Sequence, residues 1–195
     1  MSKTIKNILC YSHYDFDNIM RKNNWIDFPG EGISCISICS PNEGDLAEHW
    51  FKYDVNTFKV HGKHVFNLDI DDCGPYWFGS SENFCYDKSL ELYLNKKIQK
   101  SNNYFNYENL HILNYEEAFR LVNWIDFEIT HNHTFYIHCA VGVSRSQGVV
   151  RYILDTYGNE FDIKTNPDNP CIVPNAHIVM MLKRAYRQLF YNDIY

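Results

Sequence analysis

The chain has 195 residues and a formal net charge of −6, and 45 % of its residues are hydrophobic and 22 % charged. This length suits one domain with a substantial core, and the composition excludes a disordered chain. No run approaches the roughly eighteen apolar residues of a transmembrane helix, which excludes a membrane-spanning protein. The acidic charge argues against general binding to nucleic acid or to an anionic membrane.

The N-terminal segment Met1–Lys6 has no apolar core of the kind found in a secretory signal. We therefore expect a cytoplasmic protein whose seven cysteines are free thiols. Their number is odd and no Cys-x-x-Cys pair occurs, so neither disulfides nor a zinc cluster is expected.

Three segments of the first half of the chain have the pattern of β-strands. Lys6–Tyr11 and Ile33–Cys39 are rich in apolar and β-branched residues, and Lys63–Ile70 alternates apolar with polar residues. Asp15–Met20, between the first two, is expected to form a turn or a short helix. The third strand runs directly into two adjacent acids, Asp71 and Asp72.

A long segment then separates this strand from the next clear pattern. Asn114-Tyr-Glu-Glu117 is typical of a helix N-cap with its reciprocal glutamate, and an apolar stripe at helical spacing follows it. Since one helix cannot account for all the intervening residues, we expect an inserted segment at about 73–113 within a single domain spanning 1–195.

The most informative stretch begins with an apolar strand, Thr134–Ile137, that runs into His138 and Cys139. From Ser146 onward the apolar residues recur at helical spacing, so the loop between Cys139 and Arg145 joins the end of a strand to the start of a helix. Backbone N–H groups at such a junction have no intrahelical partner and lie at the positive end of the helix dipole. The loop is therefore a candidate binding site for a dianion such as phosphate.

The side chains of this loop suit phosphoryl transfer. Arg145 can bind two phosphoryl oxygens at once, and the amides and dipole that attract phosphate also stabilise a thiolate at Cys139. Gly142 lets the backbone turn tightly and approach the ligand. Ser146 can donate a hydrogen bond to the sulfur, which makes it a better leaving group. The alternative interpretation is a buried structural cysteine at a strand end.

The pattern His138-Cys139-x5-Arg145-Ser146, with Gly142 and Ser144 inside, resembles the signature of the dual-specificity branch of the cysteine-dependent protein tyrosine phosphatases. The opening of the last predicted helix, Pro174-Asn175, is similar to that of small single-domain members from phages and bacteria. The resemblance implies a three-layer α/β fold, with a mainly parallel central sheet and helices on both faces.

The resemblance also implies roles for individual residues. Cys139 is the nucleophile, and His138 orders the loop rather than acting as a base. The general acid is an aspartate just past a strand that precedes the signature, which favours Asp72 and leaves Asp71, one position off, as the alternative. No metal or cofactor is implied. The phosphate-binding loop comprises Ala140, Val141, Gly142, Val143, Ser144 and Arg145.

His131, His133 and His138 invite a metal-site interpretation, which we reject because no carboxylate or thiolate lies at ligand spacing with them. Asp162–Pro170 is polar and rich in turn residues, and is expected to be a loop.

Together with the resemblance, these patterns predict a protein phosphatase that hydrolyses phosphotyrosine monoesters, with phosphoserine and phosphothreonine left open. The expected partner is a phosphorylated protein or peptide, because the loop lacks the extra lysines of related phosphoinositide phosphatases. The alternatives are an RNA 5′-triphosphatase and a phosphopeptide-binding pseudophosphatase. A thiol redox role would need a second cysteine near the loop, and the sequence offers only Cys73 and Cys171 as distant candidates. The sequence leaves the oligomeric state open.

Overall fold

The computed structural model describes residues 3–25, 31–40, 62–71, 111–167 and 174–191. Asp72 and most of the expected insertion, 73–110, lie outside these residues, as do Cys73 and Cys171.

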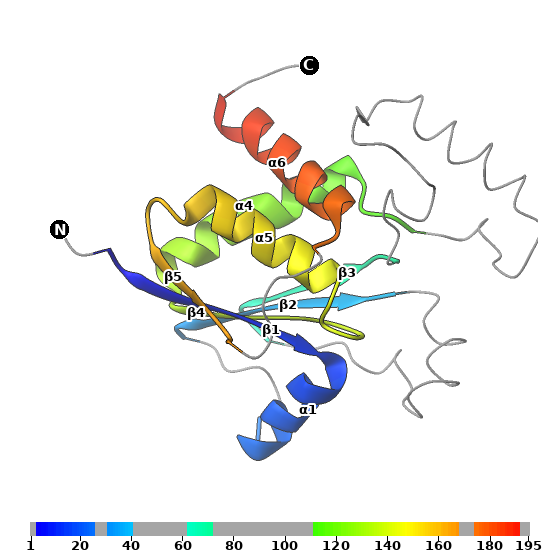
Figure 1. Ribbon diagram of the computed structural model, residues 1–195, viewed down its shortest axis with the longest axis vertical. Helices are drawn as coiled ribbons and strands as arrows, with labels where there is room; N and C mark the ends of the chain where they lie inside the picture. The colour runs from blue at the N-terminus through cyan, green and yellow to red at the C-terminus, as the bar shows by residue number, and fades with distance from the viewer. Residues whose placement is uncertain (1–2, 26–30, 41–61, 72–110, 168–173, 192–195) are drawn as a thin grey trace, which may run out of the picture.

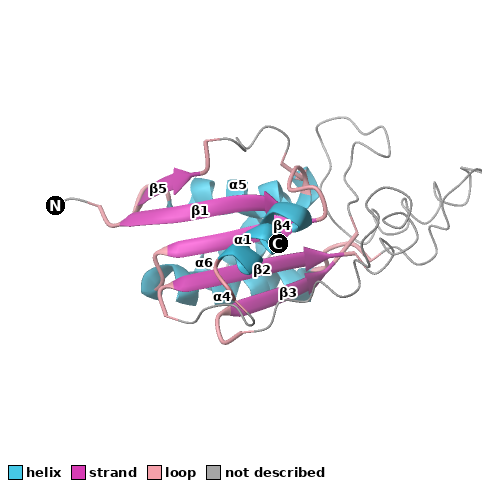
Figure 2. Cartoon of the chain, turned by 90° about the horizontal axis from the view of Figure 1, so that it is seen from below, coloured by secondary structure: helices cyan, strands magenta, loops and turns pink. Residues whose placement is uncertain are grey.

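The described residues form one five-stranded sheet with the order β3-β2-β4-β1-β5. Every neighbouring pair in this sheet is parallel, and the strands run side by side in Figure 2. The strands are β1 (Ile5–Ser12), β2 (Ile33–Cys39), β3 (Val65–Asp69), β4 (Thr134–Cys139) and β5 (Asp162–Thr165).

Helices cover both faces of this sheet. They are α1 (His13–Lys22), α4 (Tyr115–His131), α5 (Arg145–Tyr157) and α6 (Ala176–Tyr191). Figure 1 shows α4, α5 and α6 on one face and α1 on the other. The expected three-layer α/β fold with a parallel central sheet is therefore confirmed.

Two apolar clusters hold the layers together. The larger one joins the sheet to α4, α5 and α6 through fully buried side chains such as Ile137, Leu121 and Met181. The smaller one lies under α1, where Phe16 packs with Cys35 of β2. Burying one large aliphatic side chain contributes about 1.5–3 kcal/mol, so each helix is fixed mainly by its apolar face.

The local signals identified in the sequence coincide with most of these elements. The N-cap of α4 is Asn114, and both hydrogen bonds of the capping box with Glu117 are present. The prediction that Asp162–Pro170 is entirely a loop is wrong, because Asp162–Thr165 forms β5. This strand is short, polar and at the edge of the sheet, where pairing with β1 fixes it without an apolar run.

The register brings the ends of several strands to one edge of the sheet. Ser12 at the end of β1 is level with Cys139 at the end of β4, and Cys39 of β2 is level with Asp69 of β3. Ligands of parallel α/β sheets bind at this edge, beyond the carboxyl ends of the strands. Within the described part of the chain, no helix combines the length and apolar character needed to cross a bilayer.

Candidate active site

Cys139 is the last residue of β4, and its side chain is 2 % exposed. The Gly142 N–H donates to Cys139 Sγ at 3.3 Å, and Ser146 Oγ lies 3.2 Å from the same sulfur. The loop therefore curls back so that its own backbone and the first turn of α5 surround the sulfur. Two donors at this distance can stabilise negative charge on it.

Gly142 has a φ of +74°, a conformation that favours glycine. A Cβ at this position would lie 2.6 Å from the backbone carbon of Tyr11 and 2.7 Å from the Ser12 nitrogen. The tight turn inferred from the sequence is present, and the structure adds a second reason for a glycine here. The close neighbour is the end of β1, on which the loop packs.

The start of α5 has no side-chain cap. Ser144 is the N-cap, and its side chain makes no capping hydrogen bond. The Ser144 carbonyl accepts from the N–H of Gly148 at 2.9 Å and from that of Asn175 at 3.1 Å, which ties the start of α6 to the loop. The helix dipole therefore favours an anion at this end of α5.

Arg145 begins α5 and is 2 % exposed. Its Nη1 donates to the Ile70 carbonyl at 3.0 Å, which joins the loop to the end of β3. Burial lowers the pKa of Arg145 to about 10. At neutral pH the guanidinium is charged, and it adds a fixed positive charge to the loop.

Of the two candidate acids, the described residues include Asp71. Its carboxylate accepts hydrogen bonds from the Ser40 hydroxyl and from the His111 N–H, the latter at 2.8 Å. The Asp71 N–H in turn donates to the His111 carbonyl at 2.7 Å. Asp71 therefore connects the ends of β2 and β3 to the segment before α4. A carboxylate with both oxygens bonded in this way is placed to fix a loop.

His138 lies beneath the loop on the α1 side of the sheet. Its Nδ1 is 2.7 Å from Nδ1 of His13, and its ring stacks on Phe16 with centroids 4.3 Å apart. The His13 N–H donates to the Ala140 carbonyl at 3.3 Å. The pair thus links the loop to the first turn of α1.

Both rings of this pair are neutral at pH 7. Burial and then the Arg145 charge lower the pKa of His13 to about 4, and burial and then His13 lower that of His138 well below its usual range. One proton lies between the two Nδ1 atoms, so one ring carries its hydrogen on Nδ1 and the other on Nε2.

Three residues of the site were missed by sequence reasoning. Cys10 of β1 donates from Sγ to Ser146 Oγ at 3.1 Å, and Gln147 Nε2 donates to the Gly142 carbonyl at 3.2 Å. His13 is the third. The expectation that no second cysteine lies near the loop is wrong, because Cys10 does. Gln147 follows the signature directly, whereas no local signal marks Cys10 or His13, which are brought in by the β1–β4 register.

The rim of the loop is apolar. Val141 is 56 % exposed and Val143 48 %. No lysine or arginine other than Arg145 belongs to the loop itself. The rim therefore suits a substrate with an apolar or aromatic group next to its phosphate.

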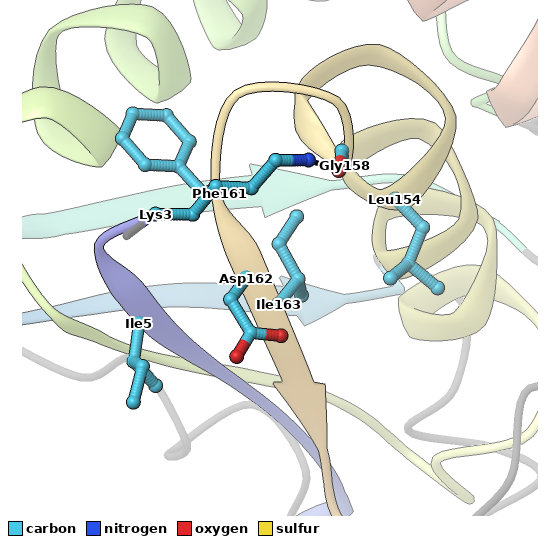
Figure 3. A pocket seen from close by; sticks show the side chains of 7 residues that line it. All are labelled: Lys3, Ile5, Leu154, Gly158, Phe161, Asp162 and Ile163. Atoms are coloured by element: carbon cyan, nitrogen blue, oxygen red, sulfur yellow. Dashed lines mark hydrogen bonds between the residues drawn. The ribbon is translucent and has the colours of Figure 1, made fainter. Parts of the chain in front are cut away.

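Other parts of the described chain offer less chemistry. No group of three or more His, Cys, Asp and Glu side chains among these residues is placed to hold a metal ion. A pocket of about 640 Å³ lies at the start of β1 and β5, with Lys3, Phe161 and Asp162 in its lining (Figure 3). It lies at the opposite end of β1 from Ser12, the residue level with Cys139, and its described lining contains neither cysteine nor serine.

No protein-family model and no curated protein matches the chain. Among solved structures, the chain is similar to a human tyrosine phosphatase-like serine/threonine/tyrosine-interacting protein. The identity is 17 % and the TM-score 0.40, over 89 % of this chain and 83 % of that one. Similarity at this level adds no argument about the chemistry, which rests on the residues themselves.

Proposed function

We propose that the protein is a metal-independent phosphomonoester hydrolase that acts through a phosphocysteine intermediate. The observation that carries the proposal is the arrangement around Cys139. Its sulfur has two hydrogen-bond donors within 3.3 Å, at the N-terminal end of a helix that begins with a buried arginine. An isolated structural cysteine needs none of these groups.

The mechanism follows from the chemistry of the side chains. The Cys139 thiolate attacks phosphorus, the bond to the leaving oxygen breaks, and Asp72 gives that oxygen its proton. Arg145 and the loop amides stabilise the charge on the equatorial oxygens. Water then attacks the phosphocysteine and gives its proton to the Asp72 carboxylate. The S–P bond breaks and inorganic phosphate leaves, while Ser146 donates to the departing sulfur.

The proposed substrate is a phosphoprotein or phosphopeptide, with phosphotyrosine preferred. The exposed side chains of Val141 and Val143 in the loop support this preference, because an aromatic ring next to the phosphate can pack on them. Phosphoserine and phosphothreonine present no such group, and are proposed as poorer substrates of the same site.

Two alternatives from the sequence remain as competing proposals. An RNA 5′-triphosphatase needs basic residues along its approach, and the net charge of −6 argues against it. A phosphopeptide-binding pseudophosphatase would bind without turnover. Cys139 and Arg145 both argue for turnover, since binding alone needs no nucleophile.

The test is steady-state hydrolysis of p-nitrophenyl phosphate in EDTA and reductant. We expect turnover by the wild type, loss of at least about a thousandfold in Cys139→Ser, and a large loss in Arg145→Lys, which cannot bind two oxygens at once. A wild type that binds a phosphotyrosine peptide but does not hydrolyse it would establish the pseudophosphatase instead.

The same assay separates the two candidate acids. Asp72→Asn should lower kcat and remove the basic limb of the pH profile while leaving the urea midpoint unchanged. Asp71→Asn replaces an oxygen that accepts from the His111 N–H, so we expect a loss of about 1–3 kcal/mol in unfolding free energy. If Asp71→Asn alone changed the pH profile, the acid would be Asp71.

A further inference from the structure

Three buried side chains form a hydrogen-bonded series beside the nucleophile. Cys10 Sγ is 3.1 Å from Ser146 Oγ, and Ser146 Oγ is 3.2 Å from Cys139 Sγ. All three residues are at most 2 % exposed, so bulk water does not compete for these contacts. The Ser146 hydroxyl lies between the two sulfurs, and both cysteines are free thiols.

The thiolate form of Cys139 fixes the direction of the series. A thiolate only accepts hydrogen bonds, so the single hydrogen of the Ser146 hydroxyl must point at Cys139 Sγ. Ser146 Oγ can then only accept from Cys10. The geometry has Cys10 as the donor in that contact.

The Gly142 carbonyl is a second acceptor near the Cys10 thiol. It lies 3.5 Å from Cys10 Sγ, farther than Ser146 Oγ, and it already accepts from Gln147 Nε2 at 3.2 Å. Of these two acceptors, Ser146 Oγ is therefore the one better placed for the Cys10 hydrogen.

Both backbone hydrogen-bonding groups of Cys10 are held by the side chain of Asn166. Asn166 Oδ1 accepts from the Cys10 N–H at 3.0 Å, and Asn166 Nδ2 donates to the Cys10 carbonyl at 2.9 Å. Cys10 also lies within β1, next to β4. Its thiol is thus presented to Ser146 by a fixed backbone.

We propose that Cys10 is a positioning residue that directs the Ser146 hydroxyl hydrogen at the Cys139 sulfur. The Cys10 S–H bonds the oxygen, and the Ser146 O–H bonds the thiolate before attack and the departing sulfur during phosphocysteine hydrolysis. This inference rests on the proposed function of Cys139 as the nucleophile. It assigns a role to a residue that lies outside the signature and more than a hundred positions before it.

The test measures the reactivity of Cys139 without any substrate. The rate of alkylation by iodoacetamide at about pH 6 follows the thiolate population, and mass spectrometry of the peptide that contains Cys139 separates it from the other thiols. We expect Cys10→Ala to slow this rate by about two- to tenfold, the effect of one neutral hydrogen bond. Cys10→Ser keeps a donor, and should recover most of the rate.

A double-mutant cycle with Ser146→Ala separates positioning from packing. If Cys10 acts through Ser146, Cys10→Ala has no further effect in the Ser146→Ala background. Cys10→Val, which fills the site without a donor and suits a strand, should behave like Cys10→Ala. Cys35→Ala is the matched control, since Cys35 is fully buried on the other face of the sheet and should leave the rate unchanged.

The outcomes that would overturn the proposal are equally specific. An unchanged rate in Cys10→Val, or the same slowing in the presence and absence of the Ser146 hydroxyl, would show that Cys10 does not act through Ser146. If Cys10→Ala slowed alkylation only when the Ser146 hydroxyl is present, but the protein hydrolysed no phosphomonoester, the role of Cys10 would be supported. Only the proposed function would then be overturned.

Discussion

At the scale of single residues, the loop around Cys139 depends on Gly142. Its φ of +74° favours glycine, and its Cα faces the backbone of Tyr11. Both features belong to the folded loop, so the sequence indicated a tight turn here without indicating what lies next to it.

Replacing Gly142 by alanine should damage both stability and activity. The left-handed backbone and the contact at 2.6 Å together predict a loss of about 2–5 kcal/mol in unfolding free energy. Urea denaturation and p-nitrophenyl phosphate hydrolysis measure the two effects.

Gly32 provides the matched control for this substitution. It has a φ of +79°, but a Cβ there would meet nothing within 4 Å. Gly32→Ala should therefore cost only about 1–2 kcal/mol and leave kcat unchanged. Equal losses in the two variants would show that the contact with β1 does not constrain the loop.

The residues of the signature could be predicted because they are consecutive in the chain. One short pattern contains Cys139, Arg145 and Ser146, and its chemistry can be inferred from the sequence before the fold is known. Cys10 and His13 could not be found in this way, since only the parallel pairing of β1 with β4 brings them to the loop. A single sequence contains no periodic signal for such a contact.

At the scale of elements, α1 is tied to β4 by the pair His13 and His138. Both imidazoles are buried and neutral, and their pKa values are lowered, to about 4 for His13. In the unfolded chain a histidine binds its proton at about pH 6.5. Between these two values the unfolded state binds more protons than the folded one, so acid favours unfolding.

The free energy of unfolding should therefore fall as the pH falls from about 6.5 to about 4. Each histidine contributes up to about 1.4 kcal/mol per pH unit within that window. Urea denaturation at several pH values measures the slope. His13→Gln should reduce it, whereas His133→Gln, which changes an exposed side chain, should leave it as it is in the wild type. An unchanged slope in His13→Gln would contradict the assignment.

Elements with strong local signals were predictable, and the others were not. The capping box of α4 and the apolar run of β2 each consist of residues that are close together in the sequence, so both can be recognised locally. β5 has four residues, two of them charged, and it forms because it pairs in parallel with the edge of β1. Tertiary pairing decides such a strand, so its residues alone resemble a loop.

In the molecule as a whole, the parallel sheet brings the residues of the candidate active site together at one edge. The ends of β1, β3 and β4 supply Cys10, the Ile70 carbonyl that holds Arg145, and Cys139. The layered fold could be predicted from the signature and the alternation of strands and helices. The folding of 73–110, which lies outside the described residues, stays a prediction, as does the role of Asp72.

The opposite end of the sheet is held by a buried polar network. Glu128 of α4 accepts from the Ser34 hydroxyl at 2.6 Å, and it contacts Nδ1 of His64 at 3.0 Å. Lys6 donates to the Asn132 carbonyl at 2.8 Å. These contacts join the C-terminal end of α4 to β1, to β2 and to the residue before β3, at the end of the sheet away from Cys139.

The most direct test of the account is to detect the phosphocysteine itself. The protein is mixed with a phosphotyrosine peptide, quenched in acid within the first turnovers and digested for mass spectrometry. We predict one added phosphoryl group on the peptide that contains Cys139, more of it in Ser146→Ala, where the sulfur leaves less readily, and none in Cys139→Ser. Turnover without this adduct, together with an active Cys139→Ser variant, would contradict the account.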